Sequence, residues 1–289
     1  MTIDFVLSCE TNRMTFDFVR ADPAQASVVI VGVPLDRSSS FIPGTRFGPD
    51  AARLGSVNIE SFSPYQKRDA AELAIADAGD VCFTFSNPDA PFEQIRSVTR
   101  SNIEADRKQL AVGGEHTITP AIVSELVRAH PDLCIVQFDA HSDLRDDFLG
   151  EKWCHATAMR RVLDFVPRYR LFQVGIRSFS QAAEMDVPEL FAFDVLDSIG
   201  TVRQRIGSRP VYISLDVDVL DPSVLPDVQT PQPGGVTYQE LAKALAGLAK
   251  LGVVGADIVE FCPRGPHPTA GAPVVAELVR ELAIVLGTS

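Results

Sequence analysis

Short runs of β-branched and other apolar residues recur along the chain, separated by more polar stretches. Runs of this length, bounded by Gly, Pro or polar residues, predict buried strands. Eight such runs cover residues 27–34, 73–79, 109–116, 133–141, 170–177, 190–195, 210–218 and 253–261.

Between these runs lie stretches in which apolar residues recur at helical spacing. The clearest cover residues 94–108, 119–129, 156–164, 237–250 and 272–286. Strands and helices therefore mostly alternate, which is typical of a mainly parallel sheet covered on both faces. We predict an α/β fold of three layers, α/β/α, around a central, mainly parallel sheet of eight strands.

The chain shows no boundary between domains. A length of 289 residues fits one large α/β domain, and no shift of composition, linker or internal repeat divides it. The Pro-rich stretch 222–235 is too short to separate two domains. We expect residues 1–289 to form a single domain.

Charge and cysteine content narrow the class of protein. Lys and Arg number 26 against 38 Asp and Glu, a net charge of −12 that disfavours nucleic acid as a partner and favours small cations. The 5 cysteines contain no CxxC pair, which indicates free thiols in a reducing compartment. With no basic leader and no run of 18 apolar residues, we expect a cytoplasmic protein without a membrane segment.

Acidic and imidazole side chains gather where three predicted strands end. Asp139, His141 and Asp143 alternate along one end, so an extended chain would aim all three in the same direction. Asp216 and Asp218 repeat this spacing. A third strand ends at His116, and ligands of open α/β sheets gather at such carboxyl ends.

These four Asp and two His form an oxygen-rich set without sulfur, which suits hard ions such as Mn²⁺ better than structural zinc. Six ligands are too many for one open catalytic ion. Two ions that share two carboxylates would each keep a full shell and a bridging water, whose lowered pKa supplies hydroxide at neutral pH. With two divalent ions, four carboxylates and one hydroxide, the charge balance favours a cationic substrate such as a guanidinium group. The alternative, that each run merely caps a strand, fits one run better than three.

Three motifs connect this chemistry to a known family. GGEHT (113–117), DAHSD (139–143) and SLDVDVLDP (214–222) resemble the three signatures of the ureohydrolase family, which includes arginase, agmatinase, guanidinobutyrase and formiminoglutamase. The resemblance covers nearly the whole chain and is weakest over roughly the first 25 residues. It implies an arginase-like fold and a homo-oligomer, either a trimer or a hexamer.

The resemblance also implies how the ligands divide between two manganese ions. Each ion would take one histidine and one aspartate of its own, and two further aspartates would bridge them. These are His116 and Asp143 for one ion, His141 and Asp218 for the other, and Asp139 and Asp216 as bridges. Asp143 would in addition accept a hydrogen bond from the attacking hydroxide.

Three further residues fall at family positions near the substrate. His155 would shuttle protons or stabilise the departing amine, a role suited to a side chain that titrates near neutrality. Glu260 would pair with the guanidinium and orient its central carbon, and Thr230 would touch the substrate. The implied reaction is attack of hydroxide on that carbon and collapse to urea and an amine, without an organic cofactor.

The segment after Asp143 bears on the substrate. LRDDFLGEKWCHAT (144–157) resembles the agmatinase side of the family, and Asp146, Asp147 and Glu151 would attract a dication. Agmatine, which would yield putrescine for polyamine biosynthesis, is therefore the expected substrate. Each of these acids taken alone is equally well explained as part of a solvated loop.

Two departures from the agmatinase pattern leave other substrates open. Asp227, Val228 and Gln229 replace a Gly-rich run, and Ala156 replaces the commoner Gly of a His-Gly-Thr motif. An aminopropylated agmatine, guanidinobutyrate or arginine therefore remain alternatives to agmatine.

Two other kinds of function compete with a ureohydrolase. Metal-dependent deacetylases share a related architecture but hold one zinc with fewer ligands. A metal-binding relative without activity would have lost a ligand, His155 or Glu260, whereas all are present. A nucleotide enzyme is disfavoured because no GxGxxG or GxxxxGK[ST] motif follows a strand.

Overall fold

The computed structural model describes residues 14–265 and 270–289. Its main feature is an eight-stranded sheet in the order β4-β1-β5-β10-β9-β6-β7-β8, in which every neighbouring pair is parallel. The strands are β1 (Val28–Val33), β4 (Ile75–Asp80), β5 (Lys108–Gly113), β6 (Cys134–Phe138), β7 (Leu171–Ile176), β8 (Leu190–Ala192), β9 (Val211–Asp216) and β10 (Val253–Val259). The predicted parallel sheet is confirmed.

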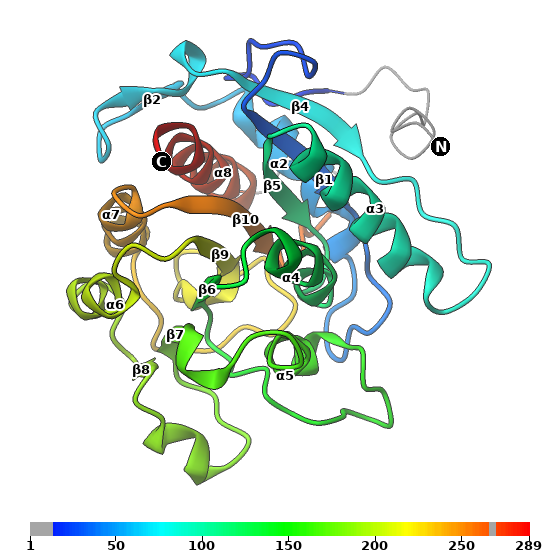
Figure 1. The fold of residues 1–289 in the computed structure, drawn as a ribbon, viewed down its shortest axis with the longest axis vertical. Helices are drawn as coiled ribbons and strands as arrows, with labels where there is room; N and C mark the ends of the chain where they lie inside the picture. The colour runs from blue at the N-terminus through cyan, green and yellow to red at the C-terminus, as the bar shows by residue number, and fades with distance from the viewer. Residues whose placement is uncertain (1–13, 266–269) are drawn as a thin grey trace.

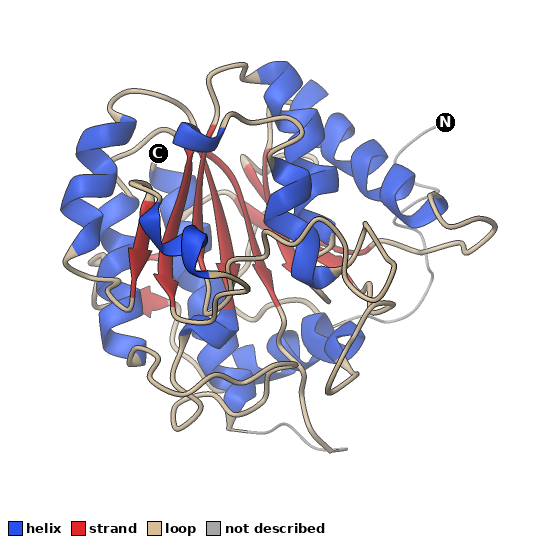
Figure 2. Cartoon of the chain, turned by 90° about the horizontal axis from the view of Figure 1, so that it is seen from below, coloured by secondary structure: helices blue, strands red, loops and turns tan. Residues whose placement is uncertain are grey.

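Helices cover both faces of the sheet (Figures 1 and 2). They are α2 (Gly48–Ser56), α3 (Ala90–Glu104), α4 (Ile118–Ala129), α5 (Ala158–Val162), α6 (Ser198–Ile206), α7 (Tyr238–Leu248) and α8 (Gly271–Thr288). Alternate residues of β1 point to opposite faces. Val28 and Ile30 join a core with α2, α6, α7 and α8, whereas Val29 and Val31 join a core with α3, α4 and α5. The three-layer α/β/α prediction is confirmed.

The helix boundaries show where the apolar pattern misleads. Helix α3 begins at Ala90 and ends at Glu104, four residues earlier than predicted, because Pro91 fits its first turn and Asp106 takes a positive φ of 53°. Helices α2 and α6 were not predicted, since each has only nine residues and contains glycine. A short hairpin of β2 (Phe62–Ser63) and β3 (Arg68–Asp69) was also missed.

The chemistry-bearing residues lie at the carboxyl edge of four central strands. Asp216 is the last residue of β9, and Asp139 directly follows β6. His116 follows β5 by three residues, and Glu260 directly follows β10. The strands predicted at 109–116 and 133–141 are therefore too long, because the chain leaves the sheet before the polar residues begin.

A buried ion-pair cluster, the Arg53 cluster, lies elsewhere in the fold. Arg53 of α2 donates through Nε and Nη2 to the two oxygens of Asp77, at 2.8 and 3.0 Å, and through Nη1 to Asp80 at 2.6 Å. Its side chain is 1 % exposed. Burial opposes the charge of Arg53, but the two carboxylates outweigh this effect and raise its pKa.

Two other expectations concern cysteines and membranes. Of the cysteines in the described ranges, Cys134, Cys154 and Cys262 are free thiols. Cys9 and the N-terminal run on which the leader prediction rests lie outside the described residues. Among the helices of residues 14–265 and 270–289, none combines the length and apolar character that a bilayer crossing requires.

Candidate active site

The first group of predicted ligands surrounds the His116 ring. Its Nδ1 atom lies 3.0 Å from Asp143 Oδ2, 3.2 Å from Asp139 Oδ2 and 3.5 Å from Asp216 Oδ2. The ligand atoms of His116, Asp139 and Asp216 all lie within 4.8 Å of one another. All four side chains are buried. The structure thus brings together residues from the ends of three strands.

The second group shares Asp139 with the first. The Nδ1 atom of His141 lies 2.9 Å from Asp218 Oδ2 and 3.7 Å from Asp139 Oδ1. Asp139, His141 and Asp218 again place their ligand atoms within 4.8 Å of one another. The structure therefore brings all six predicted ligands together. Asp139 belongs to both groups, as the resemblance implies for a bridging ligand, whereas Asp216, the other implied bridge, belongs to the first group only.

The polar atoms of this cluster fit two divalent cations. His116 Nδ1 and Asp218 Oδ2 are fully buried and make no hydrogen bond of good geometry despite their close charged neighbours, an arrangement that is costly unless another partner binds them. The opposite oxygen of Asp218 accepts from Ala140 N at 3.0 Å, and Asp216 Oδ1 accepts from Asp218 N at 2.8 Å. These bonds fix the carboxylates while leaving oxygen and imidazole atoms free for hard ions.

The pKa shifts point to an excess of buried negative charge. Burial and the negative charge of Asp139 raise the pKa of Asp143 to about 6. Burial and the charges of Asp218 and Asp139 raise the pKa of Asp216. Burial opposes protonation of His141, but Asp218 and Asp139 outweigh it and raise its pKa to about 12. Such a cluster is stabilised by added positive charge.

A chain of buried polar groups contacts the Nε2 atom of His116 and orients its ring. His116 Nε2 lies 2.9 Å from Ser214 Oγ, which donates to Asp257 Oδ1 at 2.7 Å. The other oxygen of Asp257 accepts from Thr119 Oγ1 and Tyr212 OH, both at 2.7 Å. Because Ser214 Oγ gives its proton to Asp257, it accepts from His116 Nε2. This favours the tautomer with the proton on Nε2, which leaves the lone pair of Nδ1 facing the carboxylates. The sequence analysis missed Asp257, although an acid inside the apolar strand β10 is a signal for such a role.

Glu260 is held rigidly beside the cluster. Its backbone takes a positive φ of 70°, an uncommon conformation for glutamate that occurs at functional sites. Its Oε1 accepts from His116 N and its Oε2 from Gln229 Nε2, both at 2.7 Å. Burial raises the pKa of Glu260 to about 8, and Glu115 adds to this effect. An added cation would favour the ionised form.

His155 faces two serines of an earlier loop. Its Nδ1 lies 3.2 Å from Ser38 Oγ and its Nε2 lies 3.1 Å from Ser40 Oγ. Burial, together with the nearby charges of His141 and His116, lowers its pKa to about 4. This pKa lies below the near-neutral range expected from the sequence, so the imidazole is neutral at pH 7 with His141 and His116 charged. A neutral ring can still accept one proton and pass on another through a serine hydroxyl.

Further residues singled out in the sequence are more exposed than His155 and Glu260. Thr230 is half-buried in the loop that follows Gln229. Asp146, Asp147 and Glu151 are exposed, and Asp146 pairs with Arg160 at 2.8 Å. This ion pair reduces the negative charge that Asp146 can offer to a dication.

Comparison with known proteins places the chain in a family. Residues 26–285 match the Arginase family. The chain is 36% identical over 276 residues to an agmatinase of Bacillus cereus, covering 92% of this chain and 95% of that protein. It is 33% identical to the N(1)-aminopropylagmatine ureohydrolase of Thermococcus kodakarensis, covering 89% of this chain and 90% of the relative.

The fold also matches that of a solved structure. The proclavaminate amidino hydrolase from Streptomyces clavuligerus superposes with a TM-score of 0.87 at 27% identity, covering 96% of this chain and 98% of that chain. The resemblance in the three motifs is thereby confirmed. The chain belongs to the arginase family, whose members are binuclear-metal hydrolases that act on guanidino C–N bonds.

Proposed function

We propose that this protein is an agmatinase, which uses two Mn²⁺ ions to hydrolyse agmatine to putrescine and urea in polyamine biosynthesis. One observation carries the proposal: two groups of candidate ligands, all buried except the half-buried His141, share Asp139, and the Glu260 carboxylate accepts from the backbone N–H of His116. The site therefore combines ligands for a pair of hard ions with a buried carboxylate for a guanidinium.

The residues divide the work of the reaction. His116, Asp139, His141, Asp143, Asp216 and Asp218 would hold the two ions. When bound, these ions supply a nucleophilic water of lowered pKa and stabilise developing negative charge. Glu260 would accept two N–H groups of the guanidinium and fix the direction of its central carbon.

Asp143 and His155 would handle protons. Asp143 would accept a hydrogen bond from the attacking water. The C–N bond to the alkyl-bearing nitrogen then breaks, the water oxygen becomes the urea carbonyl, and the leaving amine gains a proton. His155 would relay this proton, because its two ring nitrogens each face a serine hydroxyl.

Two observations favour agmatine over other guanidines as the substrate: the activity that a relative is named for, and the acidic residues close to His155 in the sequence. The Bacillus cereus relative is named an agmatinase, and Asp147 and Glu151 carry exposed negative charge on the stretch of chain that precedes His155. An ammonium group at the far end of agmatine suits that charge, whereas the carboxylate of arginine or guanidinobutyrate does not.

The test is a panel of guanidines offered to the manganese-loaded protein. Urea release would be measured with agmatine, arginine, guanidinobutyrate and an aminopropylated agmatine, with Asp143→Asn as control. We expect the highest kcat/KM with agmatine and loss of turnover in the control. Preference for another guanidine would contradict the substrate, and no urea from any of them would contradict the function.

We further propose that residues 1–289 form a single domain of a cytoplasmic homo-oligomer, a trimer or a hexamer. One parallel sheet takes strands from residue 28 to residue 259, and the chain then adds α8 to the core shared with α2. Light scattering of the purified protein would give the number of subunits, and a monomer would contradict this proposal.

A further inference from the structure

Gln229 makes two hydrogen bonds in opposite directions from one amide group. Its Nε2 donates to Glu260 Oε2 at 2.7 Å, and its Oε1 accepts from Ser40 N at 2.9 Å. The residue is fully buried, with a relative exposure of 0%. Gln229 therefore joins two segments that lie far from it and from each other in the sequence.

The first of these bonds fixes the Glu260 carboxylate. His116 N already donates to Oε1 at 2.7 Å, so each carboxylate oxygen has one donor among residues 14–265 and 270–289. An ionised carboxylate has about four lone-pair sites. One site therefore remains on each oxygen, which is what a guanidinium needs for two parallel N–H bonds. With both oxygens held, the plane of the carboxylate is set before substrate binds.

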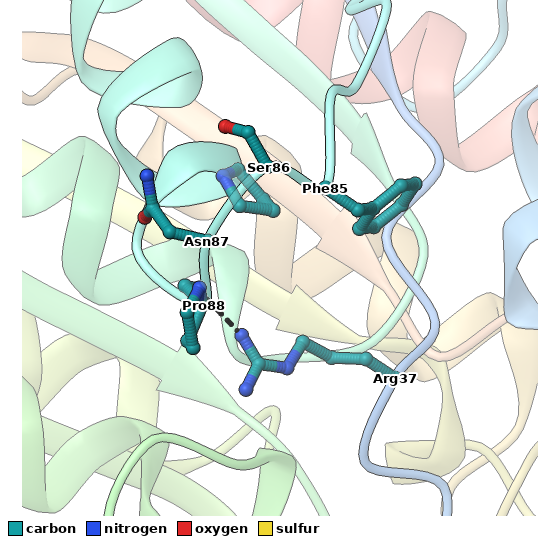
Figure 3. Close-up of a pocket in the computed structure, with 6 residues that line it drawn as sticks. Arg37, Phe85, Ser86, Asn87 and Pro88 are labelled. Atoms are coloured by element: carbon teal, nitrogen blue, oxygen red, sulfur yellow. Dashed lines mark hydrogen bonds between the residues drawn. The ribbon is translucent and has the colours of Figure 1, made fainter.

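The second bond reaches the loop that holds His155. Ser40 Oγ and Ser38 Oγ contact the two ring nitrogens of His155, at 3.1 and 3.2 Å. The same loop is tied on its outer side, where Arg37 Nη1 donates to Pro88 O at 2.8 Å (Figure 3). The hydrogen bond from Ser40 N to Gln229 holds this loop at a second point and links it to Glu260.

A glycine could make neither of these contacts, because both come from the side-chain amide. Both contacts therefore depend on the identity of residue 229. We propose that Gln229 is a positioning residue, which fixes the Glu260 carboxylate and, through Ser40, the loop that orients His155. This inference rests on the proposed hydrolysis of a guanidine.

Three variants separate this role from a structural one. Gln229→Met keeps the side-chain length but removes both bonds, whereas Gln229→Glu keeps the acceptor for Ser40 N and loses the donor to Glu260. The matched control is Gln66→Met, since Gln66 Nε2 also donates to a buried carboxylate, Glu281 Oε2, at 2.7 Å. Glu281 lies on α8, and its carboxylate accepts from Ser63 and Gln66 of the β2–β3 hairpin and from Arg280, none of which is a predicted ligand.

Kinetics of the manganese-loaded proteins test the tie to Glu260. With the fastest guanidine of the panel, we expect Gln229→Met and Gln229→Glu to lower kcat by roughly 10²-fold, the scale of a misplaced reactive group. KM should change much less, because the guanidinium can still pair with a carboxylate that His116 N holds by one oxygen only. Gln66→Met should keep the kcat of the unsubstituted protein. Normal kcat in both Gln229 variants would overturn the inference.

Hydrogen exchange tests the tie to Ser40 without any turnover. We expect the peptide that contains residues 36–40 to exchange faster in Gln229→Met, and to keep its protection in Gln229→Glu and Gln66→Met. Unchanged exchange in Gln229→Met would show that Gln229 does not hold this loop. If the unsubstituted protein releases urea from no guanidine, the proposed function fails, while the exchange result still decides whether Gln229 holds the loop.

Discussion

Two buried clusters of charged residues in this fold differ in how their negative charge is compensated. In the Arg53 cluster, one guanidinium from α2 binds the carboxylates of Asp77 and Asp80, so the fold supplies its own counter-charge. In the candidate active site, the carboxylates outnumber the histidines, and His116 Nδ1 is buried without a hydrogen bond. The first cluster is complete within the chain, whereas the second has ligand atoms left over for cations.

The largest effect should follow from removing the shared ligand of the site. Asp139→Asn keeps the shape of the side chain but removes a charge that both metal groups need, so we expect urea release to fall about 10³-fold or more. The matched change in the Arg53 cluster, Asp77→Asn, should leave kcat within a factor of two or so of normal. Equal losses in the two variants would remove the distinction between the clusters.

The next largest effect should appear in stability. Arg53→Met leaves the carboxylate of Asp77, whose side chain is 0% exposed, without a cation beside it. We expect the free energy of unfolding to fall by about 3–5 kcal/mol, as for other broken buried ion pairs. Denaturation in urea at fixed manganese concentration would measure this loss. A loss below about 1 kcal/mol would mean that water reaches Asp77, as it does at exposed ion pairs.

Metal binding should depend on pH in a direction that the histidines set. The carboxylates around His141 raise its pKa to about 12, so it is protonated at neutral pH until a metal displaces the proton. Affinity for Mn²⁺ should therefore rise with pH, by up to about tenfold per unit for each proton released. Calorimetry at pH 7 and 8, in buffers of different ionisation enthalpy, would measure both quantities. Affinity that falls with rising pH would contradict this assignment.

The smallest effect is expected at the exposed acids near the site. Glu151→Gln removes one solvated charge, so we expect KM for agmatine to rise by no more than about threefold, with kcat unchanged. Raising the ionic strength should reduce the difference between this variant and the unsubstituted protein. An effect on KM of tenfold or more would place Glu151 in direct contact with the substrate.

The sequence predicts the parts of this protein that depend on local pattern. The eight strands follow from apolar runs, and the six candidate ligands follow from polar residues placed where those runs end. The local pattern does not predict tertiary contacts. Gln229 and Ser40 are hydrogen-bonded although they lie 189 positions apart in the sequence, and nothing in either segment indicates the partner. The neutral state of His155 also depends on burial and on neighbouring histidines, which only the folded chain brings together.

The proposed function requires two adjacent cations whose ligand groups have Asp139 in common. Electron paramagnetic resonance tests this requirement most directly. Manganese would be titrated into the metal-free protein, and bound ions per subunit would be counted while the spectrum is recorded. We predict two ions per subunit and the multiline signal of an exchange-coupled pair, which Asp139→Asn should abolish and Asp77→Asn should preserve. A single bound ion, or two ions that give only the spectrum of isolated Mn²⁺, would contradict the account.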